Sequence, residues 1–137
     1  MKQNLTTLTQ KVTIPASPEE VYEAFVDPKK HSEFTGSKAT GKPKVGEKFT
    51  AWDGYISGKH LELEKGKKIV QEWTNTDFPE GYPPSKFELT FKETPKGTEV
   101  TMVHSNIPAD QKEELADGWT EWYWNPLKEY FKKKKTK

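Results

Sequence analysis

The sequence contains no cysteine and no arginine, and each absence narrows the functions open to it. Without cysteine there is no disulfide, no thiolate nucleophile and no cysteine-ligated zinc site. Without arginine, phosphates and guanine cannot be recognised by a bidentate guanidinium group, because all 22 basic residues are lysines. These lysines are nearly balanced by 21 acidic residues, so the net charge of +1 favours no polyanionic partner. The composition therefore disfavours specific nucleic-acid binding and phosphoryl transfer.

Long apolar runs are also missing from the sequence. No segment approaches the roughly 18 consecutive apolar residues of a membrane-spanning helix. Residues 1–10 are polar and lack the apolar stretch of a signal peptide. We therefore expect a soluble cytoplasmic protein with no membrane span.

Apolar residues are scarce overall, since only 31% of the residues are hydrophobic and the mean hydropathy is −0.98. Such a balance leans towards disorder. The aromatic residues argue against disorder, because five Trp, five Tyr and seven Phe can each bury about 150–250 Å². A chain of 137 residues fits one domain. We predict a single folded domain over residues 1–137, a monomer, with a flexible lysine-rich tail at 132–137.

Hydrophobic periodicity predicts an α+β fold. Apolar and polar residues alternate over 5–14, which indicates a half-buried strand. Ser17-Pro18-Glu19-Glu20 has the pattern of a helix start, and Asp27-Pro28 separates that helix from a second one ending near Phe34. Further strands are predicted at 49–52, 55–64, 69–74 and 87–91, followed by one that ends at Pro108. The last helix, to about Phe131, carries the largest apolar stripe, so we expect a curved antiparallel sheet wrapped around it.

Glycine and proline add finer expectations. Asp53-Gly54 predicts a two-residue hairpin turn, and Gly58, where the apolar phase of its strand switches, predicts a β-bulge. In the last helix, Gly118 suggests a close backbone approach beside Trp119. Pro126 should kink that helix or remove one of its hydrogen bonds.

Motifs spread from about Thr9 to Phe131 resemble a known family. They are Ser17-Pro18-Glu19-Glu20-Val21-Tyr22, Gly46-Glu47-Lys48-Phe49, Trp52-Asp53-Gly54-Tyr55-Ile56-Ser57-Gly58, Ile69-Val70-Gln71-Glu72-Trp73, Gly97-Thr98-Glu99-Val100-Thr101, Gly118-Trp119 and Trp122-Tyr123-Trp124. Their order is similar to that in the family named for activators of the heat-shock chaperone ATPase, in particular the C-terminal domain of its eukaryotic co-chaperones. The resemblance implies a helix-grip (START-like) fold, with two short helices near the N-terminus. The chain is too short to hold the co-chaperones' N-terminal domain as well, so we expect a stand-alone domain.

Recognisable catalytic and metal-binding patterns are absent from the sequence. His31, His60 and His104 lie far apart and have no metal-ligand spacing. There is no GxSxG elbow and no Gly-rich phosphate loop. We therefore expect no metal, no cofactor and no enzymatic activity. His104 shares a strand face with Val100 and Met102, so we expect a hydrogen-bonded structural or cavity-wall histidine, with an acid–base role as the alternative.

Large aromatic residues supply the candidate binding site, either as a filled core or as the walls of a cavity for a hydrophobic ligand. A helical wheel places Trp119 and Trp122 within the apolar stripe of the last helix and Trp124 on the opposite face. Trp124 is therefore a candidate protein contact, unless the N-terminal strand or the 75–84 loop covers it. The candidate cavity-lining residues are Phe25, Phe34, Phe49, Trp52, Trp73, His104, Trp119 and Trp122.

The leading hypothesis is a non-catalytic binding domain of the chaperone-activator-like family. It would bind a hydrophobic small molecule between sheet and helix, a protein partner such as a chaperone, or both. Two alternatives remain at this point: an enzyme of the cyclase or hydrolase type found among START-like proteins, and a co-chaperone that stimulates a chaperone ATPase.

Overall fold

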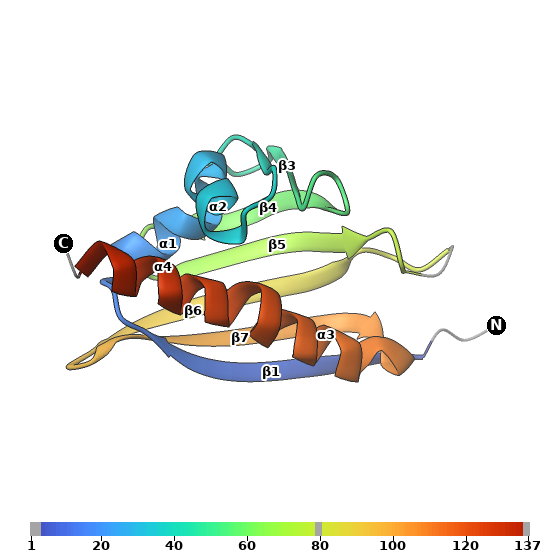
Figure 1. Ribbon diagram of the computed structural model, residues 1–137. Coiled ribbons are helices and arrows are strands. Elements are labelled where there is room, and N and C mark those ends of the chain that lie inside the picture. The colour runs from blue at the N-terminus through green and yellow to red at the C-terminus, as the bar shows by residue number, and fades with distance from the viewer. Residues whose placement is uncertain (1–3, 79–80, 136–137) are drawn as a thin grey trace.

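The computed structural model describes residues 4–78 and 81–135. One antiparallel sheet in the order β1-β7-β6-β5-β4-β3-β2 forms the body of the molecule (Figure 1). Its strands are β1 (Leu5–Ile14), β2 (Thr40–Gly41), β3 (Lys48–Ala51), β4 (Ile56–Glu64), β5 (Lys68–Asn75), β6 (Ser85–Thr94) and β7 (Gly97–Pro108). The helical segments are α1 (Pro18–Val26), α2 (Pro28–Thr35), η1 (Ala109–Gln111), α3 (Lys112–Trp119), η2 (Thr120–Trp124) and α4 (Asn125–Lys135). In Figure 1 the C-terminal helix crosses one face of the curved sheet, which confirms the predicted helix-grip architecture.

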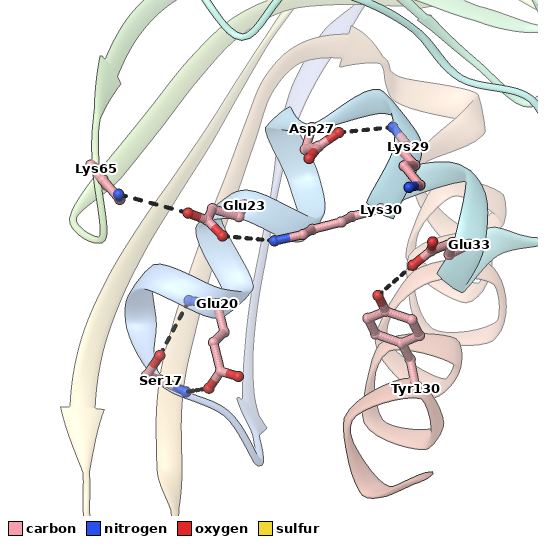
Figure 2. A network of polar contacts seen from close by, with 9 residues as sticks. All are labelled: Ser17, Glu20, Glu23, Asp27, Lys29, Lys30, Glu33, Lys65 and Tyr130. Atoms are coloured by element: carbon pink, nitrogen blue, oxygen red, sulfur yellow. Dashed lines mark hydrogen bonds and ion pairs between the residues drawn. The ribbon is translucent and has the colours of Figure 1, made fainter. Parts of the chain in front are cut away.

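Local sequence signals account for the two N-terminal helices. The Ser17 hydroxyl accepts a hydrogen bond from the Glu20 N–H at 3.2 Å, and the Glu20 carboxylate accepts one from the Ser17 N–H at 2.9 Å (Figure 2). This reciprocal pair is the predicted capping box. Asp27 ends α1 and caps α2 by accepting a hydrogen bond from the Lys29 N–H at 2.9 Å. The cap residues therefore fix where both helices begin.

The two N-terminal helices contact the C-terminal helical segments η2 and α4. Figure 2 shows the Tyr130 hydroxyl of α4 donating to the Glu33 carboxylate of α2, at 2.7 Å. Phe25 of α1 also stacks on Tyr123 of η2, with ring centroids 5.9 Å apart. The aromatic residues thus form the core between sheet and helices, as their number in the sequence suggested.

The hairpin between β3 and β4 differs from its prediction. Strand β3 ends at Ala51, and the connection comprises residues 52–55 instead of Asp53-Gly54 alone. Trp52, Asp53 and Gly54 all have positive φ angles, of 53°, 56° and 90°. Because a bulky residue rarely adopts this conformation, Trp52 is held there by its tertiary contacts.

The predicted bulge at Gly58 is wrong. The register between β4 and β5 shifts between His60 and Glu62 instead. Gly58 is required by close packing, because a Cβ atom there would lie 1.9 Å from the Glu72 carbonyl oxygen and 2.8 Å from the Phe49 ring. The glycine lets the Phe49 ring lie flat across β4, where it stacks on His60 at 5.1 Å.

The C-terminal helix contains a π-helical turn, η2, just before Pro126. The Asn125 N–H donates to the carbonyl of Thr120, five residues earlier, which widens the helix ahead of the proline. The widened turn accommodates a proline that has no N–H to donate and would crowd the carbonyl of Trp122. Pro126 therefore alters the helix as predicted, through a π turn.

The C-terminal helix extends beyond its predicted end at Phe131 and continues through Lys135. Residues 136 and 137 of the predicted flexible tail lie outside the described residues. Within the described part of the chain, no helix combines the length and apolar character needed to cross a membrane.

Candidate functional site

A cavity of about 560 Å³ opens between the end of the sheet and the first half of the C-terminal helix. Its walls come from the β3–β4 loop, the start of β4, the end of β5 and the segment after it, and the helical segments η1, α3 and η2. The lining residues are Trp52, Tyr55, Ile56, Trp73, Asn75, Asp77, Gln111, Glu114, Leu115, Gly118, Trp119, Trp122 and Tyr123. A volume of this size lies within the range of small-molecule sites, about 300–1,000 Å³.

Aromatic rings form most of the cavity's walls. Trp52 stands edge-on to Trp122, with ring centroids 5.8 Å apart and an interplanar angle of 76°. Deeper in the cavity, Trp73 lies 5.6 Å from Trp119. Trp52 has a positive φ and also lines the cavity, so the unusual backbone conformation of the β3–β4 loop lies in the cavity wall.

Polar groups gather on one rim of the cavity. The Tyr55 hydroxyl donates to the Asp77 carboxylate at 2.5 Å, and the Gln111 side-chain amide donates to the Asp77 carbonyl oxygen at 2.8 Å. The Asp77 N–H in turn donates to the Asn75 side-chain oxygen at 2.8 Å. Burial, the hydrogen bond to Asp77 and the charges of Asp77 and Glu114 raise the pKa of Tyr55 to about 12. These bonds tie the segment after β5 to the β3–β4 loop and to η1.

The interior beyond this cavity is nearly filled. A second cavity of about 20 Å³ lies among Phe25, Phe49, Trp73 and Trp119. That volume holds about one water molecule. The large aromatic residues therefore fill both expected roles. The deep ones form a packed core, and the outer ones form the walls of an open cavity.

The predicted cavity-lining residues divide accordingly. Trp52, Trp73, Trp119 and Trp122 line the large cavity. Phe25 and Phe49 line the small one, which Trp73 and Trp119 also border. Phe34 and His104 lie outside both cavities and are buried, with exposed fractions of 6% and 0%. Trp122 lies at the mouth of the large cavity, and 54% of its surface is exposed.

Of the two possibilities left open for Trp124, the structure shows the second, burial under the N-terminal strand. Only 3% of its surface is exposed, and its indole N–H donates to the Gln10 side-chain oxygen at 2.8 Å. The extra residue of the π turn rotates each later side chain by about 100° relative to an ideal helix. That rotation brings Trp124, Leu127 and Phe131 onto the buried side. The N-terminal strand covers Trp124, which was the alternative reading, so no exposed tryptophan remains at this position to contact a partner.

His104 has a fully satisfied, structural environment. Its Nδ1 accepts a hydrogen bond from the Trp119 indole N–H at 3.3 Å, and its Nε2–H donates to the Ser85 hydroxyl at 2.7 Å. Ser85 donates onward to the Trp73 carbonyl oxygen at 2.6 Å, which fixes the direction of the chain and the neutral tautomer of His104. Burial lowers the pKa of His104 to about 3. Sealed from solvent and neutral, His104 lacks the access that an acid–base role requires.

The other two histidines are also buried. His31 donates from Nδ1 to the Phe25 carbonyl oxygen and accepts from the Tyr123 hydroxyl at Nε2, both at 3.1 Å, and burial lowers its pKa to about 4. His60 accepts from the Gln71 amide at 3.3 Å, and burial lowers its pKa too. Across residues 4–78 and 81–135, no three His, Asp or Glu side chains are grouped so that they could hold a metal ion.

Sequence reasoning missed the polar rim of the cavity. Asp77 lies in an irregular segment, and only the fold brings it to Tyr55. The helical side of the rim had a signal, because Gln111, Leu115, Gly118 and Trp122 recur at the spacing of one helical face. That face mixes polar, small and aromatic residues, so a search for apolar periodicity does not find it.

Comparison with known proteins gives a consistent assignment. Residues 15–132 match the family model described as "Activator of Hsp90 ATPase homolog 1-like protein". The human activator of 90 kDa heat shock protein ATPase homolog 1 is 35% identical over 124 residues, which cover 90% of this chain and 36% of the human protein. A Dictyostelium discoideum homologue is 34% identical over 119 residues, which cover 86% of this chain and 31% of that protein. The chain therefore spans about a third of the length of these relatives.

Solved structures agree with the fold. The crystal structure of an HSP90 activator from Plasmodium falciparum superposes with a TM-score of 0.81 at 28% identity, covering 92% of this chain and 96% of the other. A Mesorhizobium loti protein of the same fold superposes with a TM-score of 0.76 at 23% identity, covering 93% and 97% of the two chains.

Proposed function

The chain belongs to the Activator of Hsp90 ATPase homolog 1-like family, and from that premise we propose that it is a non-catalytic binding domain for a hydrophobic small molecule. The ligand occupies the cavity between the sheet and the C-terminal helix. The observation that carries the proposal is the open volume of about 560 Å³ among Trp52, Trp73, Trp119 and Trp122. A filled core would bury these rings against one another and leave no such space.

Gly118 gives the sharpest test of this site. It lies on the cavity wall, and a Cβ atom there would meet only the Trp122 ring, at 3.8 Å. The close backbone approach expected from the sequence is therefore absent, and a larger side chain at this position would extend into the cavity. Gly118→Phe should obstruct the cavity, whereas Gly118→Ala adds one methyl group and serves as the matched control.

Native mass spectrometry of protein purified without denaturation measures occupancy directly. We expect a bound small molecule in the wild type and in Gly118→Ala, and its loss in Gly118→Phe. Equal occupancy in Gly118→Phe would place the ligand elsewhere. Protein free of small molecules in both the wild type and the alanine variant would contradict ligand carriage.

Family membership favours a second function, stimulation of an Hsp90-type ATPase by this domain. Support comes from the human relative and the Plasmodium falciparum structure, both described as activators. The test is the ATPase rate of purified Hsp90 with and without the domain, which should rise with domain concentration to a plateau. An unchanged rate at saturating domain would refute this function. Gly118→Phe then separates the two activities, because stimulation through the surface would survive a blocked cavity.

A further inference from the structure

The charge around the cavity is one-sided. Asp77 and Glu114 both line it and both are exposed, while among the described residues no lysine contributes to its walls. This asymmetry contrasts with the whole chain, whose 22 lysines slightly outnumber its 21 acidic residues. The two carboxylates come from different elements, the segment after β5 and the first turn of α3. The helix dipole accounts for an acidic residue in the first turn of α3, but it does not account for Asp77.

The aromatic walls favour the same sign of charge in a ligand. The faces of tryptophan rings carry partial negative charge and attract cations, most strongly where water is excluded. Trp52 and Trp122 stand edge to face at the mouth, 5.8 Å apart, and both line the same cavity as the two carboxylates. Farther in, Trp73, Leu115 and Trp119 provide apolar surface without a charged group.

We propose that the cavity selects an amphiphilic cation, with its apolar body against Trp73, Leu115 and Trp119 and its ammonium group between the tryptophans of the mouth and the carboxylates of Asp77 and Glu114. This inference rests on the proposed function and specifies the chemical class of its ligand. An anionic amphiphile such as a fatty acid would meet two like charges at the rim and no lysine among the described lining residues.

Three probes with one decyl tail test the charge preference: decyltrimethylammonium, the net-neutral decyldimethylamine oxide, and decyl sulfate. Each is titrated below its micelle concentration, with tryptophan fluorescence for binding and near-ultraviolet circular dichroism as a check that the protein stays folded. At about 4 Å from a solvated carboxylate, a unit charge gains about fivefold in affinity. We therefore expect the cation to bind at least about fivefold more tightly than the amine oxide, and the sulfate to bind most weakly. The preference should shrink at high salt.

Charge-removing variants locate the effect. Asp77→Asn and Glu114→Gln should each weaken binding of the cation by about threefold to fivefold and leave the amine oxide unchanged. Glu121→Gln removes an exposed charge from the same helical region outside the cavity and should change neither probe. Equal affinities for all three probes, or a cation preference that survives both cavity variants, would overturn the inference while leaving ligand carriage intact. Failure of every probe to bind would instead count against the proposed function itself.

Discussion

Acidification should destabilise this protein through two buried histidines. Burial holds the pKa of His31 at about 4 and that of His104 at about 3, whereas an unfolded histidine titrates near 6.5. Because the folded pKa lies below the unfolded one, the unfolded chain takes up protons that the folded protein excludes. The contribution to stability is complete above about pH 6.5 and is lost as the pH falls towards the folded values.

The magnitude follows from the size of the two shifts. One pKa unit corresponds to 1.36 kcal/mol, so between about pH 7 and about pH 5 each histidine should cost about 2 kcal/mol. Together, His31 and His104 should remove about 4 kcal/mol from a free energy of unfolding that is typically about 5–15 kcal/mol. His60 acts in the same direction, because burial lowers its pKa as well.

Urea unfolding at a series of pH values measures this loss. His31→Gln and His104→Gln should each reduce the loss of unfolding free energy between about pH 7 and about pH 5 by about 2 kcal/mol, whatever the stability of the variant at pH 7. Glu23→Gln is the control. The hydrogen bond and charge of Lys30 lower the pKa of Glu23 below its ordinary 4.5, so its contribution is lost only at lower pH. A wild-type stability that is flat over this window, or a full slope in both histidine variants, would refute the reasoning.

Three further substitutions test the packing by urea unfolding. Trp124→Ala should destabilise by about 3–5 kcal/mol because the indole is buried, and a loss near zero would show that it is exposed instead. Gly58→Ala should cost at least about 2 kcal/mol, since its Cβ would collide with the Glu72 carbonyl oxygen, and a neutral result would contradict the close β4–β5 contact. Ser17→Ala should cost about 1 kcal/mol through the lost cap of α1, and unchanged stability would show that the capping box contributes little.

The fold could be predicted where the signals are local. The capping box at Ser17 and the alternation along 5–14 depend only on neighbouring residues, and both features are confirmed. The two histidines with the lowest pKa values show the limit of such signals. Their partners, Tyr123 for His31 and Ser85 for His104, lie far away in the sequence.

The candidate site was predicted only in part, for a physical reason. Counting aromatic residues identified all four tryptophans that line the cavity, because large rings must cover the sheet. The helical wheel failed at Trp124, because one residue inserted by the π turn shifts the phase of the side chains that follow. Pro126 predicted a kink or a lost hydrogen bond in the last helix, but it did not predict that a π turn would add one residue to the helix. The polar rim of the cavity depends on Asp77, whose position is set by long-range hydrogen bonds.

The central claim is that the space beside Gly118 is a ligand site. Titration with the neutral fluorophore N-phenyl-1-naphthylamine tests it most directly, using the wild type, Gly118→Ala and Gly118→Phe. The account predicts saturable binding to the first two proteins. Gly118→Phe, folded by circular dichroism, should bind at least about tenfold more weakly, a loss of about 1.4 kcal/mol. Absence of binding to the wild type, or equal binding to folded Gly118→Phe, would contradict it.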